Sequence, residues 1–387
     1  MTPPGDLFTS IPHLEVSGWK DIPIVENNDR LVPIGPFTGY PTLFTNSIYF
    51  GERIDSPYRA DKGNELDGAF ITIFARRSVA DRLLVAQSLL PPGHRFVVYD
   101  AYRSLQVQRA LYDHYLESLR ESRPELSDDV LSEQTQKYTA IPSGNPTRPS
   151  PHNTGGSVDL AVVRLSSEDE ARIEEIDREL AELPYETDWS LFSRRAQNPY
   201  AEPDTPAKKA YLLEMERMLI MRDGGELLDY GTPFDWGGPE AALRYYEEPQ
   251  SLSPEDSEPR NNRRLQHNAL AAAGFAGYPS EWWHVNAPES QSGAQALGLP
   301  RAHFGGQELG EAHLEFEHMR RKHHASMLEQ FERVTSGDPH IPPGYRPEIP
   351  WVHELHRQAL QQMLDRNAHP GSTRLRAAAI IATPAPI

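Results

Sequence analysis

The sequence predicts an α+β fold, from two observations on the order of its segments. Three short stretches rich in apolar and β-branched residues, 94–100, 157–163 and 281–286, have the length and composition of strands. Segments with helical spacing lie between them, but without the regular alternation of strand and helix that a parallel sheet requires. A mixed fold with a small sheet and separate helices is therefore expected.

The helices are predicted from apolar spacing and from their end signals. Apolar residues recur at helical spacing from Phe74 to Leu90, and a Pro-Pro-Gly sequence then stops the helix. Ser104 is placed to cap the next helix, and Ser167 with Glu170 resembles a capping box that opens an acidic helix. Further helices are expected at about 128–138, 206–221, 262–273, 309–334 and 350–367.

Composition narrows the function. The formal net charge is −18, so the surface repels phosphate backbones and anionic lipid, and neither nucleic acid nor a membrane is an expected partner. No stretch approaches the roughly 18 consecutive apolar residues of a membrane-spanning helix, and a cytoplasmic protein is expected. The chain has no cysteine, so any zinc site must use histidine and carboxylate ligands.

One group of residues has the composition of a catalytic metal site. His152 precedes Asp159 by seven residues, with two glycines between them that allow a sharp turn. His284 is the best candidate for a third ligand, because Glu281 lies three residues before it and could serve as the general base. From spacing alone, an ordinary glycine-rich loop and a core strand with two tryptophans are the more common interpretations of such segments.

Arg103 is a second candidate, at the junction of a predicted strand and helix. There its guanidinium group could polarise a scissile carbonyl and stabilise an oxyanion. Without further context, a structural ion pair with a nearby carboxylate such as Asp100 is the simpler interpretation.

Four blocks in order resemble the D-alanyl-D-alanine dipeptidases of the vancomycin-resistance type, which are related to zinc D,D-carboxypeptidases. The blocks are YDAYRS (99–104), SPHNTGGSVDL (150–160), LDYGTPFD (228–235) and a segment ending in EWWHV (262–285). This resemblance implies a hedgehog-like fold, with a small antiparallel sheet and flanking helices, and hydrolysis of a small dipeptide such as D-Ala-D-Ala.

The resemblance also implies roles for individual residues. His152, Asp159 and His284 would bind one Zn²⁺ per chain, Glu281 would act as general base and then acid, and Arg103 would stabilise the oxyanion. Substrate contacts would come from Ser150, Trp282 and Asp229, the last binding the substrate's ammonium group, with Asp235 as the less favoured choice.

The resemblance divides the chain into three parts. Residues 1–40 form an N-terminal arm, 41–290 a catalytic domain with a helical insertion at about 165–225, and 291–387 a helical extension. The added helices could cover or narrow the cleft or form a homodimer, and the histidines of the extension are expected on solvated helix faces.

Two alternatives to a D-Ala-D-Ala-like dipeptidase remain. Pro151 and Thr154 depart from the usual metal block, which keeps a biosynthetic amidase or peptidase acting on another dipeptide or amide in view. A non-hydrolytic zinc-binding domain is the other alternative, although such a domain would be expected to have lost Glu281 or Arg103.

Overall fold

The fold is mixed α+β, as predicted, and is built around one six-stranded sheet. It was obtained as a computed structural model, which describes residues 6–335 apart from 16, 52–55, 57, 59–65, 137–138, 184–205, 249–252 and 254–255. The helix expected at 350–367 and the histidines His353 and His356 lie outside these residues. Among the described residues there is no helix long and apolar enough to cross a membrane.

The main sheet is largely antiparallel. Its strands follow the order β2-β4-β5-β8-β7, with β6 pairing at one end of β5, and only β2 runs parallel to its neighbour. A separate two-stranded sheet pairs β1 with β3. The strands are β1 (Leu31–Ile34), β2 (Phe44–Thr45), β3 (Ile73–Arg76), β4 (His94–Asp100), β5 (Ser157–Arg164), β6 (Glu226–Leu227), β7 (Ala276–Tyr278) and β8 (Glu281–Asn286).

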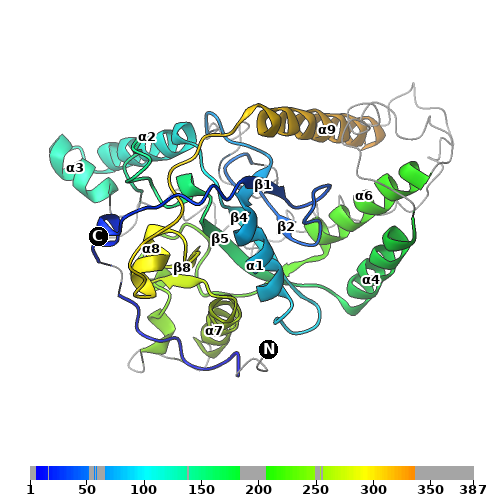
Figure 1. The fold of residues 1–387 in the computed structure, drawn as a ribbon, viewed down its shortest axis with the longest axis horizontal. Coiled ribbons are helices and arrows are strands. Elements are labelled where there is room, and N and C mark those ends of the chain that lie inside the picture. Colours follow the sequence, from blue (N-terminus) through cyan, green and yellow to red (C-terminus); the bar gives the residue numbers. More distant parts are fainter. Residues whose placement is uncertain are drawn as a thin grey trace.

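Helices lie around this sheet on several sides. In Figure 1, β4 and β5 lie at the centre, α2 and α9 run along the top, α7 lies below, and α4 and α6 lie at the right. The α-helices are α1 (Arg77–Gln87), α2 (Leu105–Ser122), α3 (Asp128–Thr135), α4 (Ser167–Glu182), α6 (Pro206–Gly224), α7 (Ser257–Ala272), α8 (Gln291–Ala296) and α9 (Glu311–Thr335). Short 3₁₀ helices are η1 (Trp19–Asp21), η3 (His152–Thr154), η4 (Pro239–Ala241) and η5 (Tyr245–Glu247).

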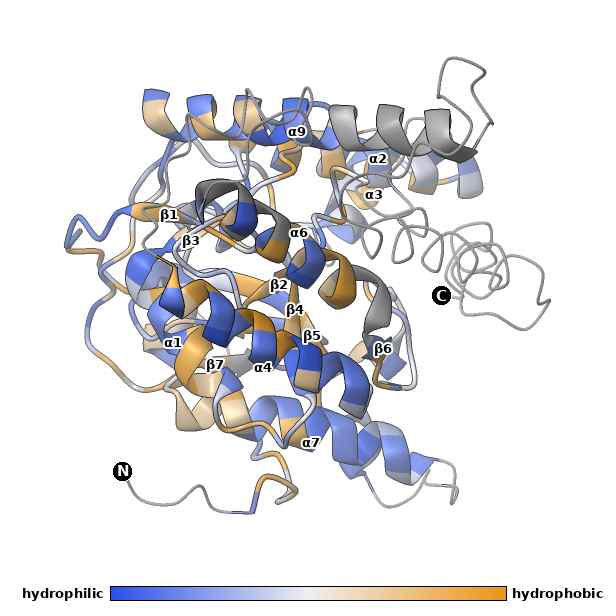
Figure 2. Ribbon diagram, turned by 90° about the vertical axis from the view of Figure 1, so that its right-hand side faces the viewer, coloured by the Kyte–Doolittle hydropathy of each residue, from blue (hydrophilic) through white to orange (hydrophobic). Residues whose placement is uncertain are grey.

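The core forms where the central strands meet these helices. Residues 158–163 of β5 are all buried, because the strand is covered on both faces. In Figure 2 the central strands are mostly orange, whereas the helices around them carry blue residues outward. This contrast is the expected result of burying one apolar face of each helix against the sheet.

Two predicted boundaries differ from the structure. Phe74 to Arg76 belong to β3 rather than to the helix, since their backbone pairs with β1, and α1 begins only at Arg77. The cap of α4 is Ser166, one residue before the predicted Ser167, and its hydroxyl accepts a hydrogen bond from the amide of Asp169 at 3.0 Å. The predicted strands 94–100 and 281–286 are confirmed.

The first 40 residues and α9 contribute to the packed structure. Ile11 is 1% exposed, and Phe316 of α9 packs with Leu31 of β1. His323 of α9 is also buried, with its ring edge-on to Phe37 at 5.3 Å between centroids, so the prediction of a solvated face is wrong for this histidine. The domain boundaries themselves stay a prediction.

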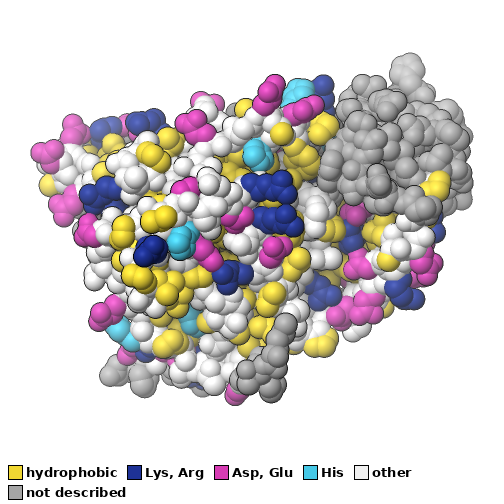
Figure 3. All heavy atoms as spheres, viewed as in Figure 1, with side chains coloured by type: hydrophobic (Ala, Val, Ile, Leu, Met, Phe, Trp, Pro, Cys, Tyr) yellow, Lys and Arg dark blue, Asp and Glu magenta, His cyan; other side chains and the backbone are white. Residues whose placement is uncertain are grey.

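The acidic excess does not cover the surface uniformly. On the face shown in Figure 3, acidic and basic side chains are interspersed, with several lysine or arginine side chains close together near the middle. The net charge therefore does not by itself define a binding surface on this face.

Candidate metal and catalytic site

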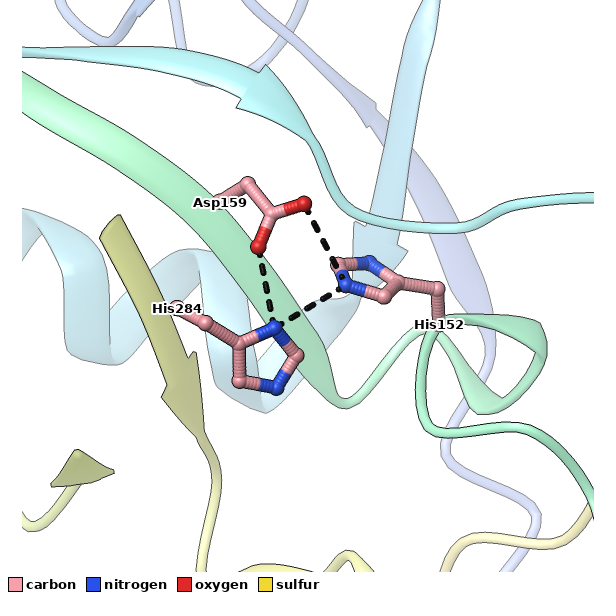
Figure 4. A group of neighbouring side chains, drawn as sticks. All are labelled: His152, Asp159 and His284. Carbon is pink, nitrogen blue, oxygen red and sulfur yellow. Dashed lines mark hydrogen bonds and ion pairs between the residues drawn. The ribbon is translucent and has the colours of Figure 1, made fainter. Parts of the chain in front are cut away.

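The predicted ligands His152, Asp159 and His284 converge at one point inside the molecule. The Nε2 atom of His152 lies 3.2 Å from Nδ1 of His284 and 3.3 Å from Oδ2 of Asp159. Nδ1 of His284 lies 2.9 Å from Oδ1 of Asp159. Figure 4 shows the three side chains pointing toward one another from β5, β8 and the turn before β5.

Strand pairing positions two of these residues. Asp159 of β5 and His284 of β8 are direct partners in the antiparallel ladder, and Asp100 of β4 is the partner of Asp159 on its other side. Directly opposed residues project from the same face of a sheet, so the ladder places these side chains together.

His152 reaches the same point from the 3₁₀ helix η3. Gly155 follows with φ of +69°, a left-handed conformation that glycine adopts without strain, and it returns the chain into β5. The buried residue Arg76, which is 1% exposed, holds this turn through two hydrogen bonds. Its backbone amide donates to the carbonyl of Gly155 at 3.0 Å, and its Nε donates to the carbonyl of Thr154 at 2.7 Å. The turn is therefore held rigidly by buried hydrogen bonds.

The donor set fits a divalent cation. The three side chains offer two imidazole nitrogens and one carboxylate oxygen, all buried and within 4.8 Å of one another. Nδ1 of His152 lies 2.9 Å from the carbonyl oxygen of Ala101, so this nitrogen carries the proton and Nε2 presents its lone pair. Three nitrogen and oxygen ligands are typical of catalytic zinc, which keeps a further position open.

The charges around the site reinforce one another. Burial opposes ionisation of Asp159, but the two neighbouring imidazoles hold the pKa of its carboxyl well below the ordinary value. Burial likewise would lower the pKa of His284, whereas the hydrogen bond and charge of Asp159 raise it. The carboxylate of Asp159 is thus ionised and available as a ligand at neutral pH.

Glu281 lies beside the three ligands, as its predicted role requires. Its Oε2 is 3.7 Å from Nδ1 of His284, and its side chain is 27% exposed. Burial, together with the negative charge of Asp159, raises the pKa of this carboxyl, although the nearby imidazoles oppose the shift. A carboxyl with a raised pKa next to a metal is suited to accept and return a proton.

Arg103 follows β4 and points back toward Asp159. Its Nε donates to Asp100 at 2.8 Å, and its Nη2 lies 3.1 Å from the hydroxyl of Tyr49 and 3.5 Å from Oδ2 of Asp159. The simpler ion pair with Asp100 is therefore present, and it orients a guanidinium group that also reaches the candidate metal site.

The predicted substrate-binding residues lie in different places. Ser150 is 3% exposed, and its hydroxyl has no hydrogen-bond partner among the described residues. Trp282 lies in the core, 2% exposed, where its ring stacks on Tyr230 and its Nε1 donates to Thr232 at 2.9 Å. The structure therefore does not support a substrate contact by Trp282, which instead holds the loop that follows β6.

Of the two acidic residues in that loop, Asp235 rather than Asp229 faces the site. Asp229 is exposed, and its carboxylate accepts from the amide of Gly231 at 2.8 Å, which closes a local turn. Asp235 has φ of +58°, and its carboxylate accepts from the hydroxyl of Tyr58 at 3.3 Å. Such a backbone conformation is uncommon for a residue other than glycine and is often found at functional sites.

The carboxylate of Asp235 interacts with the other charges of the site, although the residue as a whole is exposed. Withdrawal of this carboxylate from water, with the negative charges of Asp159 and Glu281, raises its pKa to about 8, and Arg103 opposes the shift. A positively charged group bound here would favour the ionised form.

Sequence reasoning missed Tyr49 and Tyr58, which contact Arg103 and Asp235 respectively. The rings of the two tyrosines lie 5.1 Å apart, and the guanidinium of Arg103 lies 4.8 Å over the ring of Tyr49. No local motif marks the tyrosines. Asp100, the partner expected for Arg103, is also placed beside Asp159 by strand pairing.

Comparison with known proteins agrees with this arrangement. The sequence profile of the family described as D-ala-D-ala dipeptidase matches residues 196–305, which include Asp235, Glu281 and His284. A D-alanyl-D-alanine dipeptidase of Synechocystis sp. is 23% identical over 284 residues, covering 68% of this chain and 84% of the relative. The resemblance to the D-alanyl-D-alanine dipeptidases is confirmed, and it supports peptidase activity.

Proposed function

We propose that this chain hydrolyses the amide bond of a small dipeptide, D-Ala-D-Ala-like, with one zinc ion held by His152, Asp159 and His284. One observation carries the proposal: Glu281 lies 3.7 Å from a nitrogen of a buried site whose three donors converge within 4.8 Å. Zinc bound there would supply Lewis acidity to polarise the scissile carbonyl.

The residues around the ligands account for the movement of protons. Glu281 takes a proton from the attacking water as the water oxygen bonds to the carbonyl carbon. It then gives that proton to the amide nitrogen as the carbon–nitrogen bond breaks, so one amine and one carboxylate leave. Arg103 provides positive charge for the oxyanion that exists between these two steps.

Recognition of both ends of a dipeptide would explain a preference for short substrates. Asp235 offers a carboxylate to the substrate's ammonium group, in place of the predicted Asp229, which is used in a turn. Ser150 offers a buried hydroxyl with no partner among the described side chains. A blocked amino terminus would leave the charge of Asp235 without a counterpart.

The test is a dipeptide panel with the full, zinc-loaded chain, scored by release of free amine. The panel holds D-Ala-D-Ala, the mixed D/L pairs, L-Ala-L-Ala, and D-Ala-D-Ala with either terminus blocked. Hydrolysis of D-Ala-D-Ala, with little cleavage of the N-acetylated form, is the expected result. Preference for a blocked amide would favour the amidase alternative, and no hydrolysis of any member would favour a non-hydrolytic zinc-binding domain.

A further inference from the structure

A buried arginine on α7 binds both ends of a loop that follows β6. The guanidinium group of Arg263 donates from Nε and from Nη2 to the carbonyl oxygen of Tyr230, at 3.0 and 2.6 Å. Its Nη1 donates to the carbonyl of Ala242 at 2.6 Å, and its Nη2 also donates to that of Glu240 at 2.8 Å. The 230–242 loop therefore begins and ends at one side chain, and that residue is 1% exposed.

The chemistry of arginine suits this position. Its planar guanidinium has five N–H donors and no acceptor, so one group can bind three carbonyl oxygens, which the compact ammonium of lysine cannot do in the same geometry. Burial lowers the pKa of Arg263 to about 10, so the group is still charged at neutral pH. Among the described residues no carboxylate pairs with it, and its remaining contact is with the ring of Tyr246, 4.6 Å from Cζ.

The next residue of α7 is also an arginine but has different partners. Arg264 forms an ion pair with Glu247 at 2.6 Å. It also donates to the carbonyl of Phe8 and to the hydroxyl of Ser10, at 3.2 and 3.0 Å. These partners lie outside the 230–242 loop, so binding of that loop is a property of Arg263 and not of both arginines.

The middle of the 230–242 loop carries Asp235, whose backbone needs support. Its φ of +58° is uncommon for a residue other than glycine, and such a conformation persists only where the surrounding structure holds it. The preceding Phe234 packs against Tyr99 and Trp283, with ring centroids 4.9 and 5.2 Å away. Phe234 thus anchors the middle of the loop to the sheet, while Arg263 anchors the two ends.

We propose that Arg263 is a positioning residue, which fixes both ends of the 230–242 loop and so holds the carboxylate of Asp235 toward the substrate. This inference rests on the proposed function, in which Asp235 binds the ammonium group of a dipeptide. The guanidinium of Arg263 is buried and bonded to the loop, so it acts through Asp235 and not by contact with the substrate.

Arg263→Lys tests the proposal through two measurements on the full, zinc-loaded chain. Hydrogen exchange followed by mass spectrometry should show faster exchange of the amides in 230–242, because the loop ends lose most of their donors. The value of kcat/KM for D-Ala-D-Ala should fall about 10-fold, because misplacing a binding group by about 1 Å is costly. The value for N-acetylated D-Ala-D-Ala, which has no ammonium group, should fall much less.

A double variant separates positioning of Asp235 from a general structural role. In a chain that already carries Asp235→Ala, Arg263→Lys should cause little further loss of kcat/KM, because the group that it positions is absent. Losses that multiply, or an equal loss for free and N-acetylated substrate, would overturn the proposal.

The matched control is Arg264→Lys, which changes the same residue type one position along α7. It should leave both the exchange of 230–242 and the preference for free dipeptide unchanged. If Arg263→Lys does not fold, Tyr246→Leu removes the ring beside the guanidinium and should change both measurements in the same direction by a smaller amount.

The outcomes are distinguishable from those of the proposed function. Unchanged exchange of 230–242 in folded Arg263→Lys would overturn the role of Arg263 alone. A wild-type chain that hydrolyses no dipeptide would overturn the proposed function. The exchange measurement, which needs no substrate, would then still show whether Arg263 fixes the loop.

Discussion

The metal side and the substrate side of the candidate site are built from different kinds of structure. Asp159 and His284 are paired across neighbouring strands, and the turn carrying His152 is fixed by Arg76. The groups proposed to hold the substrate, Asp235 and Ser150, lie in connecting segments instead. Strand register can fix donor atoms to within the tolerance of a metal, whereas loops allow the substrate contacts to vary.

Removing a ligand from the metal side should have the largest effect. His152→Ala takes away one of three donors, so zinc content should fall well below one per chain and hydrolysis should be lost with it. Elemental analysis of the purified protein measures the first and amine release the second. Full zinc content in this variant would show that the metal is bound elsewhere.

Substitution on the substrate side should reduce catalysis while zinc stays bound. Asp235→Ala removes the proposed partner of the ammonium group, and losing a hydrogen bond to a charge costs about 1.5–3 kcal/mol, or roughly a 10- to 100-fold lower kcat/KM. The loss should be smaller for N-acetylated substrate, which has no ammonium group. Asp229→Ala is the matched control and should behave as the wild type, since its carboxylate serves a local turn.

The opposite result for these two variants would support the prediction made from the sequence, that Asp229 binds the substrate's ammonium group. If Asp229→Ala lowered kcat/KM for free dipeptides and Asp235→Ala did not, Asp229 would be the ammonium partner. The contact of Asp235 with Tyr58 would then be structural.

A third and smaller effect is expected from substitutions in α9, which packs against a segment near the substrate side of the site. The buried carboxylate of Glu317 accepts hydrogen bonds at 3.0 Å from the amides of Ile71 and Thr72. Thr72 lines a small cavity that Arg103 and Tyr49 also line. The helix is thus tied to a segment that adjoins the proposed catalytic arginine.

Glu317→Ala should lower the free energy of unfolding by about 1–3 kcal/mol, because it leaves buried amides without an acceptor. Glu317→Gln keeps one acceptor oxygen and should lose less. Chemical denaturation measures both, and zinc content should stay at the wild-type level in each. Loss of zinc from either Glu317 variant would contradict this separation. It would show that the metal side depends on the contacts of α9 near the substrate side.

The difference between the metal side, built on strands, and the substrate side, built on loops, also explains which site residues could be predicted from the sequence. The ligands and Glu281 lie on or beside strands with clear apolar patterns, but spacing alone left other interpretations open, and the resemblance of four blocks to the D,D-dipeptidases is what joined them. Asp229 and Asp235 are six residues apart in a loop, and spacing does not show that Asp229 closes a local turn while Asp235 contacts Tyr58. Trp282 was misplaced because its neighbour in sequence, Glu281, faces the site while the indole packs on Tyr230.

Packing between distant segments was the least predictable feature. His323 looks like a surface residue in a charged helix, yet it is buried because residues near Phe37 fold back against α9. Periodicity within one helix cannot show what lies opposite it. The expected cytoplasmic location, the dimer, and the absence of nucleic-acid and membrane partners stay predictions.

The most direct test of the central claim compares zinc content and hydrolysis in Glu281→Ala. We expect one zinc per chain, as in the wild type, because Glu281 is not among the three converging donors, and loss of D-Ala-D-Ala hydrolysis because the variant lacks the carboxylate proposed to move the proton. Hydrolysis at the wild-type rate with zinc bound would contradict the account.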